Sequence, residues 1–464
     1  MTPAQILSLG PQLAAFLGEF DDCFTRSEPR GHLASYVRGQ LSDLPRKSVQ
    51  PIADFNGTPR RTLQEFLDWS SWSPSGLRDR VQQIVTRDHA DPQAIGIIDD
   101  SGHPKSGDKT ACVQRQWCGN TGKVDNCVVS VHLSYASFDT SFRAMLDSDL
   151  FLPEHSWNDP ERRTEAGIPD EIVYQPKYDI ALEQVRRALA NGVSFAWLTA
   201  DEWYASVPDF LAGLETLQQR YVVEIRRNFH GWLCDPRSKT RAVYRDVETL
   251  CRYSRALLRQ PWQRVYLKDT EKGPKVWEVK AAPFWLQRDD RALGPYWLLC
   301  ARNVLDPTEV KYFLSNAAPG TPLEVLLHVA FARWSIERCL EDEKDELGLS
   351  HFEVRQYEAI QRHLSVTQVS HLFLVRQTER LWGEKSGDHA VPGTHGSQYL
   401  DRCPAPVSPR PEPASGANFP PTDPGSREER ARTPLPHAGS IDPSGRARYQ
   451  PCRTPMLHTK IEVK

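Results

Sequence analysis

The first 90 residues carry apolar side chains at the spacing of helices. Ile6 and Leu13 begin this pattern, and Leu63 and Phe66 continue it further along the chain. Apolar positions that recur three and four residues apart form one face of a helix, which packs against a neighbouring element. We therefore expect residues 1–90 to form a helical amino-terminal region.

From about residue 93 the apolar pattern becomes that of β-strands. The run AIGIIDDSG is apolar until Asp99 and Asp100, and a turn follows. Two further runs, CVQRQWC and CVVSVHLSYAS, flank the turn GNTGKVDN and predict a β-hairpin. Three consecutive strands followed by mixed helices and strands predict an antiparallel meander that is extended by α/β crossovers.

Helix and strand then alternate through residues 178–228. The segment YDIALEQVRRALANG predicts a helix that ends at Gly192, because glycine readily adopts the left-handed conformation that closes helices. VSFAWLTA predicts a buried strand that ends at Asp201. PDFLAGLETLQQR and YVVEIRRN predict the next helix and the next strand.

Further along, FARWSIERCLEDEKDELGL predicts one continuous helix that carries Arg333, Glu337 and Lys344. At about 100° per residue these side chains project at about 0°, 40° and 20°, and so from one face. A carboxylate between two cations can hold a divalent metal while the cations hold phosphate oxygens. Arg/Glu pairs four residues apart are also common on solvated helices, so this helix alone does not distinguish the two roles.

The helical pattern ends at about residue 385. Fourteen of the 36 prolines fall in the last 79 residues, together with many Ser, Gly and Arg residues. Such a composition cannot bury enough apolar surface to fold. We expect a disordered proline-rich tail at residues 385–464, without a functional site.

Charge and cysteine content narrow the class of protein. The net charge is −3, so a nucleic-acid-binding surface must be a local patch. Residues 220–268 hold twelve Arg/Lys and four Asp/Glu among several aromatic residues, which is typical of such a surface but also of a charged strand-rich segment. The ten cysteines are scattered singly, and no run approaches the roughly 20 apolar residues of a membrane span. We expect a soluble cytoplasmic protein with no membrane contact.

Three acidic positions follow or face predicted strand ends. Asp99 and Asp100 follow one strand and Asp201 follows another, and ligands bind at the ends of central strands in open α/β sheets. Glu337 on a helix across that edge would complete a three-carboxylate site for Mg²⁺ or Mn²⁺. Two such ions can promote phosphodiester chemistry. Strand alternation places Asp99 and Asp100 on opposite faces, and we favour Asp100, with Asp99 as the alternative.

The loop at residues 102–110, GHPKSGDKT, is similar to a nucleotide-phosphate loop but lacks one of its essential features. Lysine should directly follow the second glycine, and Asp108 intervenes before Lys109. This departure disfavours a nucleotide-hydrolysing function. We predict that Lys105 and Lys109 contact phosphates, and an ordinary solvated turn explains them equally well.

The order of these motifs resembles a known family. Strand–Asp, strand–Asp and R-x-x-x-E-x-x-x-x-x-x-K resemble insertion-sequence transposases of the DDE superfamily, in the IS-four-like group. The segments DDSGHPKSG, RQWCGNTGKVDNC and GLSHFEVRQY add to the resemblance, which extends over roughly residues 15–380.

The resemblance implies a role for each candidate residue. Asp100, Asp201 and Glu337 would be catalytic and would bind Mg²⁺ or Mn²⁺. Arg333 and Lys344 would correspond to the basic members of the group's Tyr-Arg-Glu-Lys signature and would bind DNA phosphates.

The resemblance also implies an α/β fold. Its ribonuclease-H-like core would be a mixed sheet flanked by helices, with a helical amino-terminal region and a β-rich insertion. We expect a helical region that could contact DNA at residues 1–90 and the first part of the core at 91–230. A basic β-rich insertion is expected at 231–308, the end of the core with the Glu helix at 309–384, and the tail at 385–464.

The implied function is DNA transposition. The protein would act as a homodimer on double-stranded DNA, cleave strands at the terminal repeats of a mobile element by water attack, and join the freed 3′-hydroxyl to target DNA. Two other functions stay open. The chain could be an inactive or domesticated copy that only binds DNA, or a simple metal-dependent nuclease that does not join strands.

Overall fold

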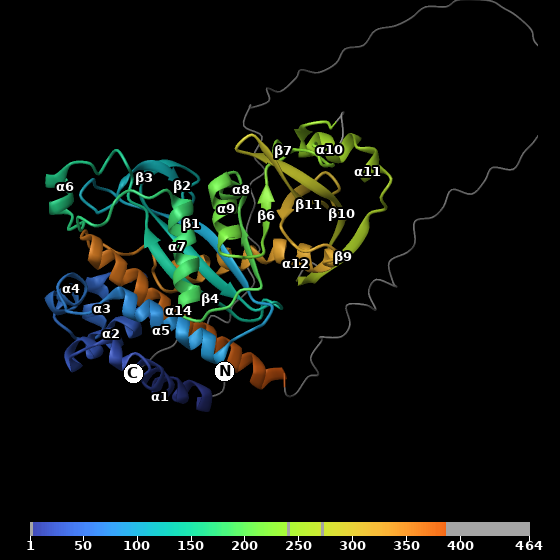
Figure 1. The fold of residues 1–464 in the computed structure, drawn as a ribbon. Helices are drawn as coiled ribbons and strands as arrows, with labels where there is room; N and C mark the ends of the chain where they lie inside the picture. Colours follow the sequence, from blue (N-terminus) through green and yellow to red (C-terminus); the bar gives the residue numbers. More distant parts are fainter. Residues whose placement is uncertain (1–2, 239–241, 271–272, 387–464) are drawn as a thin grey trace, which may run out of the picture. The chain divides into compact units, whose positions relative to one another are not determined.

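The computed structural model describes residues 3–238, 242–270 and 273–386 (Figure 1). Its amino-terminal part is helical, with α1 (Pro3–Gly18), the 3₁₀ turn η1 (Asp21–Cys23), α2 (Ser27–Leu41), α3 (Val49–Phe55), α4 (Arg60–Asp68) and α5 (Pro74–Asp88). The long helix α14 (Tyr357–Ser386) packs against α2, α4 and α5. In this interface Gln40 of α2 donates a buried hydrogen bond of 2.8 Å to Thr367 of α14. Segments from distant parts of the sequence therefore share one helical layer.

The central sheet, sheet A, combines an antiparallel meander with a parallel strand. Its strands are β1 (Ile95–Pro104), β2 (Gln114–Cys118), β3 (Lys123–Ala136), β4 (Arg143–Leu150) and β5 (Trp197–Ala200). β3 pairs antiparallel with β1, β2 and β4, whereas β5 pairs parallel with β1. A parallel bridge between Leu198 and Tyr221 places the next strand, β6 (Val222–Ile225), beside β5. The predicted hairpin and the α/β extension of the meander are confirmed.

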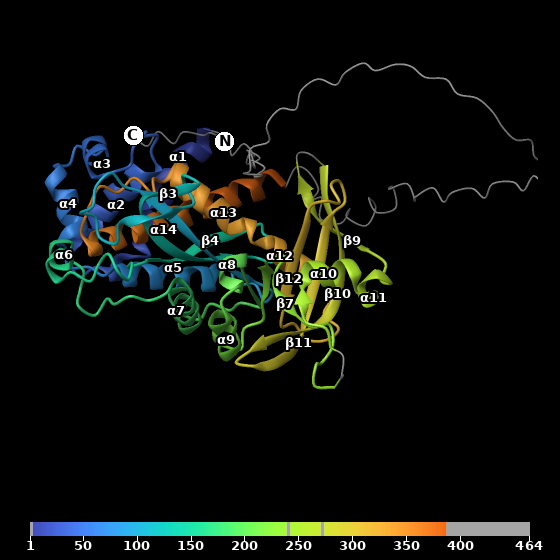
Figure 2. The ribbon, with the colours of Figure 1, turned by 90° about the horizontal axis from the view of Figure 1, so that it is seen from above.

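Helices cover both faces of sheet A (Figure 2). On one side lie α7 (Lys177–Ala190) and α9 (Pro208–Thr216), and on the other lie α13 (Trp334–Glu341) and α14. Gln184 of α7 donates a hydrogen bond of 2.8 Å to a backbone oxygen of β3, and Gln368 of α14 donates one of 2.8 Å to Ser148 Oγ of β4. Residues 127–136 of β3 are all buried, as expected for a strand covered on both faces.

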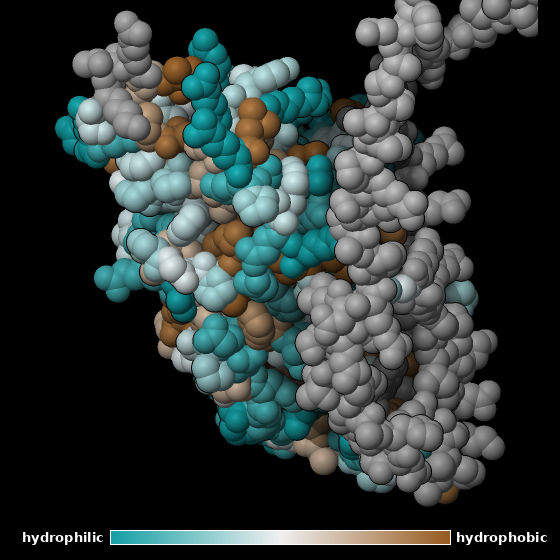
Figure 3. All heavy atoms as spheres, turned by 90° about the vertical axis from the view of Figure 1, so that its right-hand side faces the viewer, coloured by the Kyte–Doolittle hydropathy of each residue, from teal (hydrophilic) through white to brown (hydrophobic). Residues whose placement is uncertain are grey.

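A second sheet, sheet B, occupies much of the region between Asp201 and Glu337. Its strand order is β6-β12-β11-β10-β9, and all of its pairs are antiparallel. The short helix α6 (Pro160–Glu165) lies before this region. Further elements within it are α8 (Glu202–Ala205), β7 (His230–Gly231), β8 (Arg245–Asp246), α10 (Val247–Tyr253), α11 (Arg255–Leu258), β9 (Gln263–Thr270), β10 (Gly273–Arg288), β11 (Arg291–Asn303) and β12 (Val310–Ser315). Seen from the side of sheet B, the visible surface is mostly hydrophilic with small apolar areas (Figure 3).

The predicted continuous helix around Glu337 is wrong in one respect. The segment consists of α12 (Leu323–Ala332), α13 and a π-helical turn, η2 (Asp342–Glu346), and Arg333 stands at the junction of α12 and α13. α12 packs against β1 and β5 of sheet A and against β6, β9 and β10 of sheet B, whereas α13 packs against β1, β3 and β4 of sheet A. The segment leaves sheet B at Arg333, and apolar periodicity does not indicate such a change.

Two further predictions concern the carboxyl-terminal part and membranes. α14 ends at Ser386, and the proline-rich tail predicted for residues 385–464 otherwise lies outside the described residues. None of the described helices is both long and apolar enough to cross a bilayer.

Candidate active site

Asp99 and Asp201 lie at the same level of two neighbouring parallel strands. The last register pair of β1 and β5 is Ile98 with Ala200, and each aspartate directly follows its member of this pair. Paired positions of neighbouring strands project to the same face of a sheet. The sheet register therefore brings these two carboxylates together.

Backbone N–H groups orient the Asp201 side chain. Asp201 is the residue before α8, and its Oδ1 accepts hydrogen bonds from the N–H groups of Trp203 (2.9 Å) and Tyr204 (3.1 Å). This is the usual arrangement of a helix-capping aspartate. Burial raises the pKa of Asp201, and the Tyr204 N–H opposes that rise. The cap thus fixes Oδ1 of Asp201.

Arg333 connects Asp99 to Glu337. Its Nη1 lies 3.3 Å from Asp99 Oδ2, and its Nη2 lies 2.5 Å from Glu337 Oε1. The Asp99 and Arg333 side chains are mostly buried, whereas the Glu337 side chain is 55% exposed. The spacing of Arg333 and Glu337 in the sequence thus predicts a real contact, and the guanidinium extends that contact to β1.

Lys344 belongs to the same neighbourhood. It lies in η2, one element beyond α13. Burial lowers the pKa of Lys344, and the negative charge of Asp99 is the largest influence that raises it. The cation therefore lies within electrostatic range of the β1 carboxylate Asp99.

Asp100, which the sequence analysis favours over Asp99, does not face this group. Its Oδ2 accepts a hydrogen bond of 2.9 Å from Lys177 Nζ, on the side of the sheet that α7 covers. Successive residues of a strand point to opposite faces, so the contact of Asp99 with Arg333 directs Asp100 away from α13. These contacts favour Asp99, the alternative in our prediction, because Arg333 joins Asp99 to Glu337.

The negative charges around Asp99 favour the binding of a cation. Burial raises the pKa of Asp99 to about 7, Arg333 opposes that rise, and the charges of Asp201 and Asp100 add to it. A carboxyl with a raised pKa binds a proton or a metal ion in preference to remaining an uncompensated anion. The Arg333 guanidinium supplies part of that compensation.

The donor set fits a hard divalent cation. Carboxylate oxygens of Asp99, Asp201 and Glu337 are the ligands that Mg²⁺ and Mn²⁺ prefer. Within the described ranges, no three Asp, Glu, His or Cys side chains already meet at metal-binding distance. Because Arg333 stands between Asp99 and Glu337, its side chain would have to release one of them for a shared metal ion.

Comparison with known proteins identifies the family. The sequence profile of the family described as "DDE superfamily endonuclease" matches residues 19–278. The chain belongs to this family. It is also similar to the probable transposase for insertion sequence element IS701 of Microchaete diplosiphon, with 28% identity over 327 residues, which are 70% of this chain and 76% of the relative.

The segment that matches the family includes two of the three candidate carboxylates. The matched segment of this DDE superfamily endonuclease contains Asp99 and Asp201, whereas Glu337 lies beyond residue 278. The place of Glu337 rests on its ion pair with Arg333.

The two lysines of the loop after β1 have other partners in this endonuclease. Lys105 Nζ donates to the backbone oxygens of Ser350 (3.2 Å) and Phe352 (2.8 Å), and burial lowers the pKa of Lys105 to about 7. Lys109 is exposed and pairs with Glu165 at 2.5 Å. These contacts favour a structural role for Lys105 over the predicted phosphate contact, and they compensate the charge of Lys109.

A buried polar row next to Asp99 has no counterpart in our sequence analysis. His103 and His132 both contact Ser130 Oγ at 2.7 Å, and His132 Nδ1 contacts Ser148 Oγ at 2.7 Å. His132 is the β3 residue opposite Asp99, so the row lies on the same face of sheet A. Polar residues at every second position of an otherwise apolar strand were the available signal.

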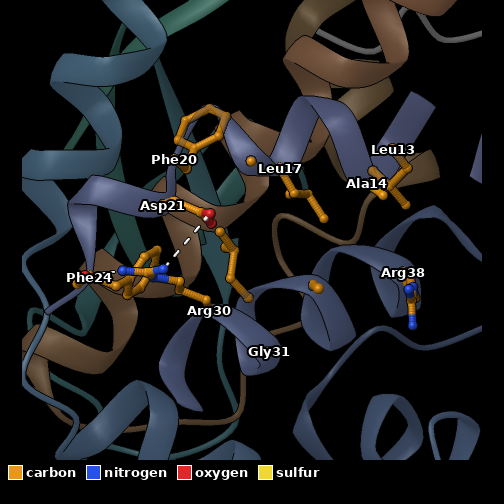
Figure 4. Close-up of a pocket in the computed structure, with 12 residues that line it drawn as sticks. Leu13, Ala14, Leu17, Phe20, Asp21, Phe24, Arg30, Gly31 and Arg38 are labelled. Carbon is orange, nitrogen blue, oxygen red and sulfur yellow. Dashed lines mark hydrogen bonds and ion pairs between the residues drawn. The ribbon is translucent and has the colours of Figure 1, made fainter. Parts of the chain in front are cut away.

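A cavity of about 300 Å³ lies apart from this site, between α1, η1 and α2 (Figure 4). Leu13, Leu17 and Phe20 supply apolar walls, and an ion pair of 3.9 Å between Arg30 and Asp21 stands at one side. No candidate catalytic residue lines this cavity.

Proposed function

We propose that this DDE superfamily endonuclease is an insertion-sequence transposase that cleaves DNA strands and joins them to target DNA. The observation that carries the proposal is the contact of Arg333 with both Glu337 and Asp99, and the register of β1 with β5 supports Asp201 as the third member of the site. The similarity to the probable IS701 transposase favours transposition over general nuclease activity.

In the proposed mechanism Asp99, Asp201 and Glu337 bind Mg²⁺ or Mn²⁺. The bound ions would lower the pKa of an attacking hydroxyl or water and compensate the charge of the leaving oxygen. Asp99 would supply its carboxylate in the ionised form, since a cation favours that form. Arg333, released from one carboxylate, would hold a non-bridging phosphate oxygen, and Lys344 would act in the same way from η2.

The remaining parts of the proposal concern architecture. Sheet A with its covering helices would be a ribonuclease-H-like core, and the strands between β6 and β12 would form the insertion, near the predicted limits of residues 231–308. The basic stretch at 220–268 would contact the terminal repeats or the target DNA. A homodimer would hold two element ends together.

A binding protein without catalysis is the main alternative. It would keep the basic surface and would not need Asp99, Asp201 and Glu337 in one neighbourhood. The presence of these three residues around Arg333 favours the enzyme.

Strand transfer tests the proposed function. Purified protein, Mg²⁺, a duplex containing the DNA that borders the gene and a supercoiled plasmid would be combined, and the products would be separated on a denaturing gel. We expect nicks with 3′-hydroxyl ends and covalent duplex–plasmid products. Nicks without joined products would indicate a simple nuclease, and DNA binding without nicks would indicate the non-catalytic alternative.

A further inference from the structure

Three cations gather around two aromatic rings next to Arg333. Lys268 Nζ of β9 lies 3.3 Å from the centre of the Trp334 ring, and the Arg143 guanidinium carbon lies 5.5 Å from the same centre. Lys275 Nζ of β10 lies 4.8 Å from the centre of the Phe331 ring. Sheet B, β4 and the α12–α13 junction thus all contribute to this cationic cluster of Lys268, Lys275 and Arg143.

No close carboxylate among the described residues balances the charge of the cationic cluster. Among the residues that the structure describes, Lys268, Lys275 and Arg143 form no ion pair with Asp or Glu within 4.0 Å. Glu309 and Glu337 influence Lys275 only as nearby charges.

Other cations of sheet B behave differently. Arg264 and Arg302 both pair with Glu278, at 3.1 and 2.7 Å, and Lys311 pairs with Glu224 at 2.8 Å. Among the described residues, the absence of close ion-pair partners is therefore specific to the cationic cluster and is not a general property of this sheet.

The three cations also repel one another. Burial, together with the charges of Lys275 and Arg143, lowers the pKa of Lys268 to about 8. His328, whose Nε2 contacts the backbone oxygen of Phe138, lies close enough for Lys268 to lower its pKa. The Trp334 ring face offsets part of this repulsion, because an aromatic face attracts a cation. An anion between the three cations would stabilise the arrangement further.

The position of the cationic cluster points to the substrate. Trp334 directly follows Arg333, which holds Asp99 and Glu337, and the charge of Glu337 reaches Lys275. We propose that Lys268, Lys275 and Arg143 form a subsite for a backbone phosphate of the DNA strand that is cleaved, next to the phosphate that reacts. This inference rests on the proposed function and adds residues that fix the position of the strand.

Phosphate is the anion class that suits this arrangement. Each phosphodiester carries one negative charge with two non-bridging oxygens, which several cations can share from different sides. A contact of this kind positions the strand without reading its sequence. The cationic cluster would therefore act on every DNA sequence alike, and would set which phosphate stands before Asp99 and Asp201.

Salt dependence of binding tests the subsite. The doubly substituted protein Lys268→Gln/Lys275→Gln would be compared with wild type for binding, by fluorescence anisotropy, of a labelled duplex that contains the DNA bordering the gene. We expect weaker binding and a plot of log affinity against log salt whose slope is shallower by about 1 to 2. Arg302→Gln is the matched control on β11, because Arg302 lies outside the basic stretch, is already paired with Glu278 and should leave the slope unchanged.

A second measurement uses the unaltered protein. Single phosphates of the duplex would be replaced by neutral methylphosphonates, one position at a time. Replacement of one phosphate beside the cleaved phosphate should weaken DNA binding by wild type but not by Lys268→Gln/Lys275→Gln. Equal losses of affinity in both proteins, or an unchanged salt slope, would overturn the subsite. Cleavage by wild type in that case would still support the proposed function. Failure of wild type to bind or cleave this DNA would overturn both.

Discussion

The substitution Asp99→Asn is expected to reduce the rate of Mg²⁺-dependent strand cleavage by about 10³-fold or more, while Asp100→Asn leaves it within about threefold of wild type. The loss reflects several kcal/mol of metal-assisted charge stabilisation, at one factor of ten for each 1.4 kcal/mol. Asn keeps the shape of the side chain and one oxygen for Arg333, but it lacks the negative charge that a cation requires. Asp100 contacts Lys177 on the other side of the sheet.

Single-turnover cleavage of a duplex that contains the DNA bordering the gene measures this pair of variants. Both proteins should first be shown to unfold at temperatures close to that of wild type, since Asp100→Asn loses an ion pair that is only partly buried. An inactive Asp100→Asn protein beside an active Asp99→Asn protein would reverse our assignment. It would show that the β1 strand presents its other face in the complex with DNA.

The second large effect is expected for Glu337→Gln, which should also lower cleavage by about 10³-fold while DNA affinity stays equal or rises. Gln can still accept the hydrogen bond from Arg333, so the α12–α13 junction should keep its shape. Removing a carboxylate next to Arg333 and Lys275 lowers the local negative charge that a DNA phosphate meets.

Glu341→Gln is the matched control for this prediction. Glu341 lies one turn further along α13, and it pairs with Arg338 at 2.8 Å instead of Arg333. Cleavage and binding by this variant should resemble those of wild type. Full cleavage by Glu337→Gln would remove Glu337 from the site and would leave the two strand aspartates without the predicted third ligand.

The contacts of Asp99 show which part of the site the sequence could predict. Two apolar runs that each end in aspartate predicted neighbouring carboxylates. The parallel register of β1 and β5 brings Asp99 and Asp201 to the same level, although β1 continues past Asp99 to Pro104. The choice between Asp99 and Asp100 could not be made from the sequence, because alternation states only that the two point to opposite faces. The contacts with Arg333 and Lys177, on opposite sides of the sheet, favour Asp99.

The helix that carries Glu337 shows a different limit. Helical spacing predicted the contact of Arg333 with Glu337, which spans a single turn. At Arg333 the segment passes from α12, which packs against both sheets, to α13, which packs against sheet A, and a π-helical turn around Lys344 follows. Local periodicity contains no signal for these tertiary contacts. Residue spacing predicts contacts within one helical turn, whereas tertiary contacts determine where the helix is interrupted.

The basic residues depend even more on tertiary contacts. Sequence proximity to β1 suggested that Lys105 binds phosphate, yet two backbone carbonyl oxygens already hold its ammonium group. Lys268 and Lys275 were only two among many cations of a basic stretch and its neighbourhood. Lys268 meets Arg143, more than 100 positions away, at the Trp334 ring, and Lys275 lies over the Phe331 ring; no pattern along the chain indicates these contacts.

The most direct test of the central claim is the position of Mn²⁺ in a crystal of the protein bound to a duplex that contains the DNA bordering the gene. We expect anomalous density at about 2.1 Å from carboxylate oxygens of both Asp99 and Asp201, with Glu337 turned from Arg333 toward the same ions. Manganese bound at Asp100 and away from Asp99, or absent from this strand end at saturating concentration, would contradict the account.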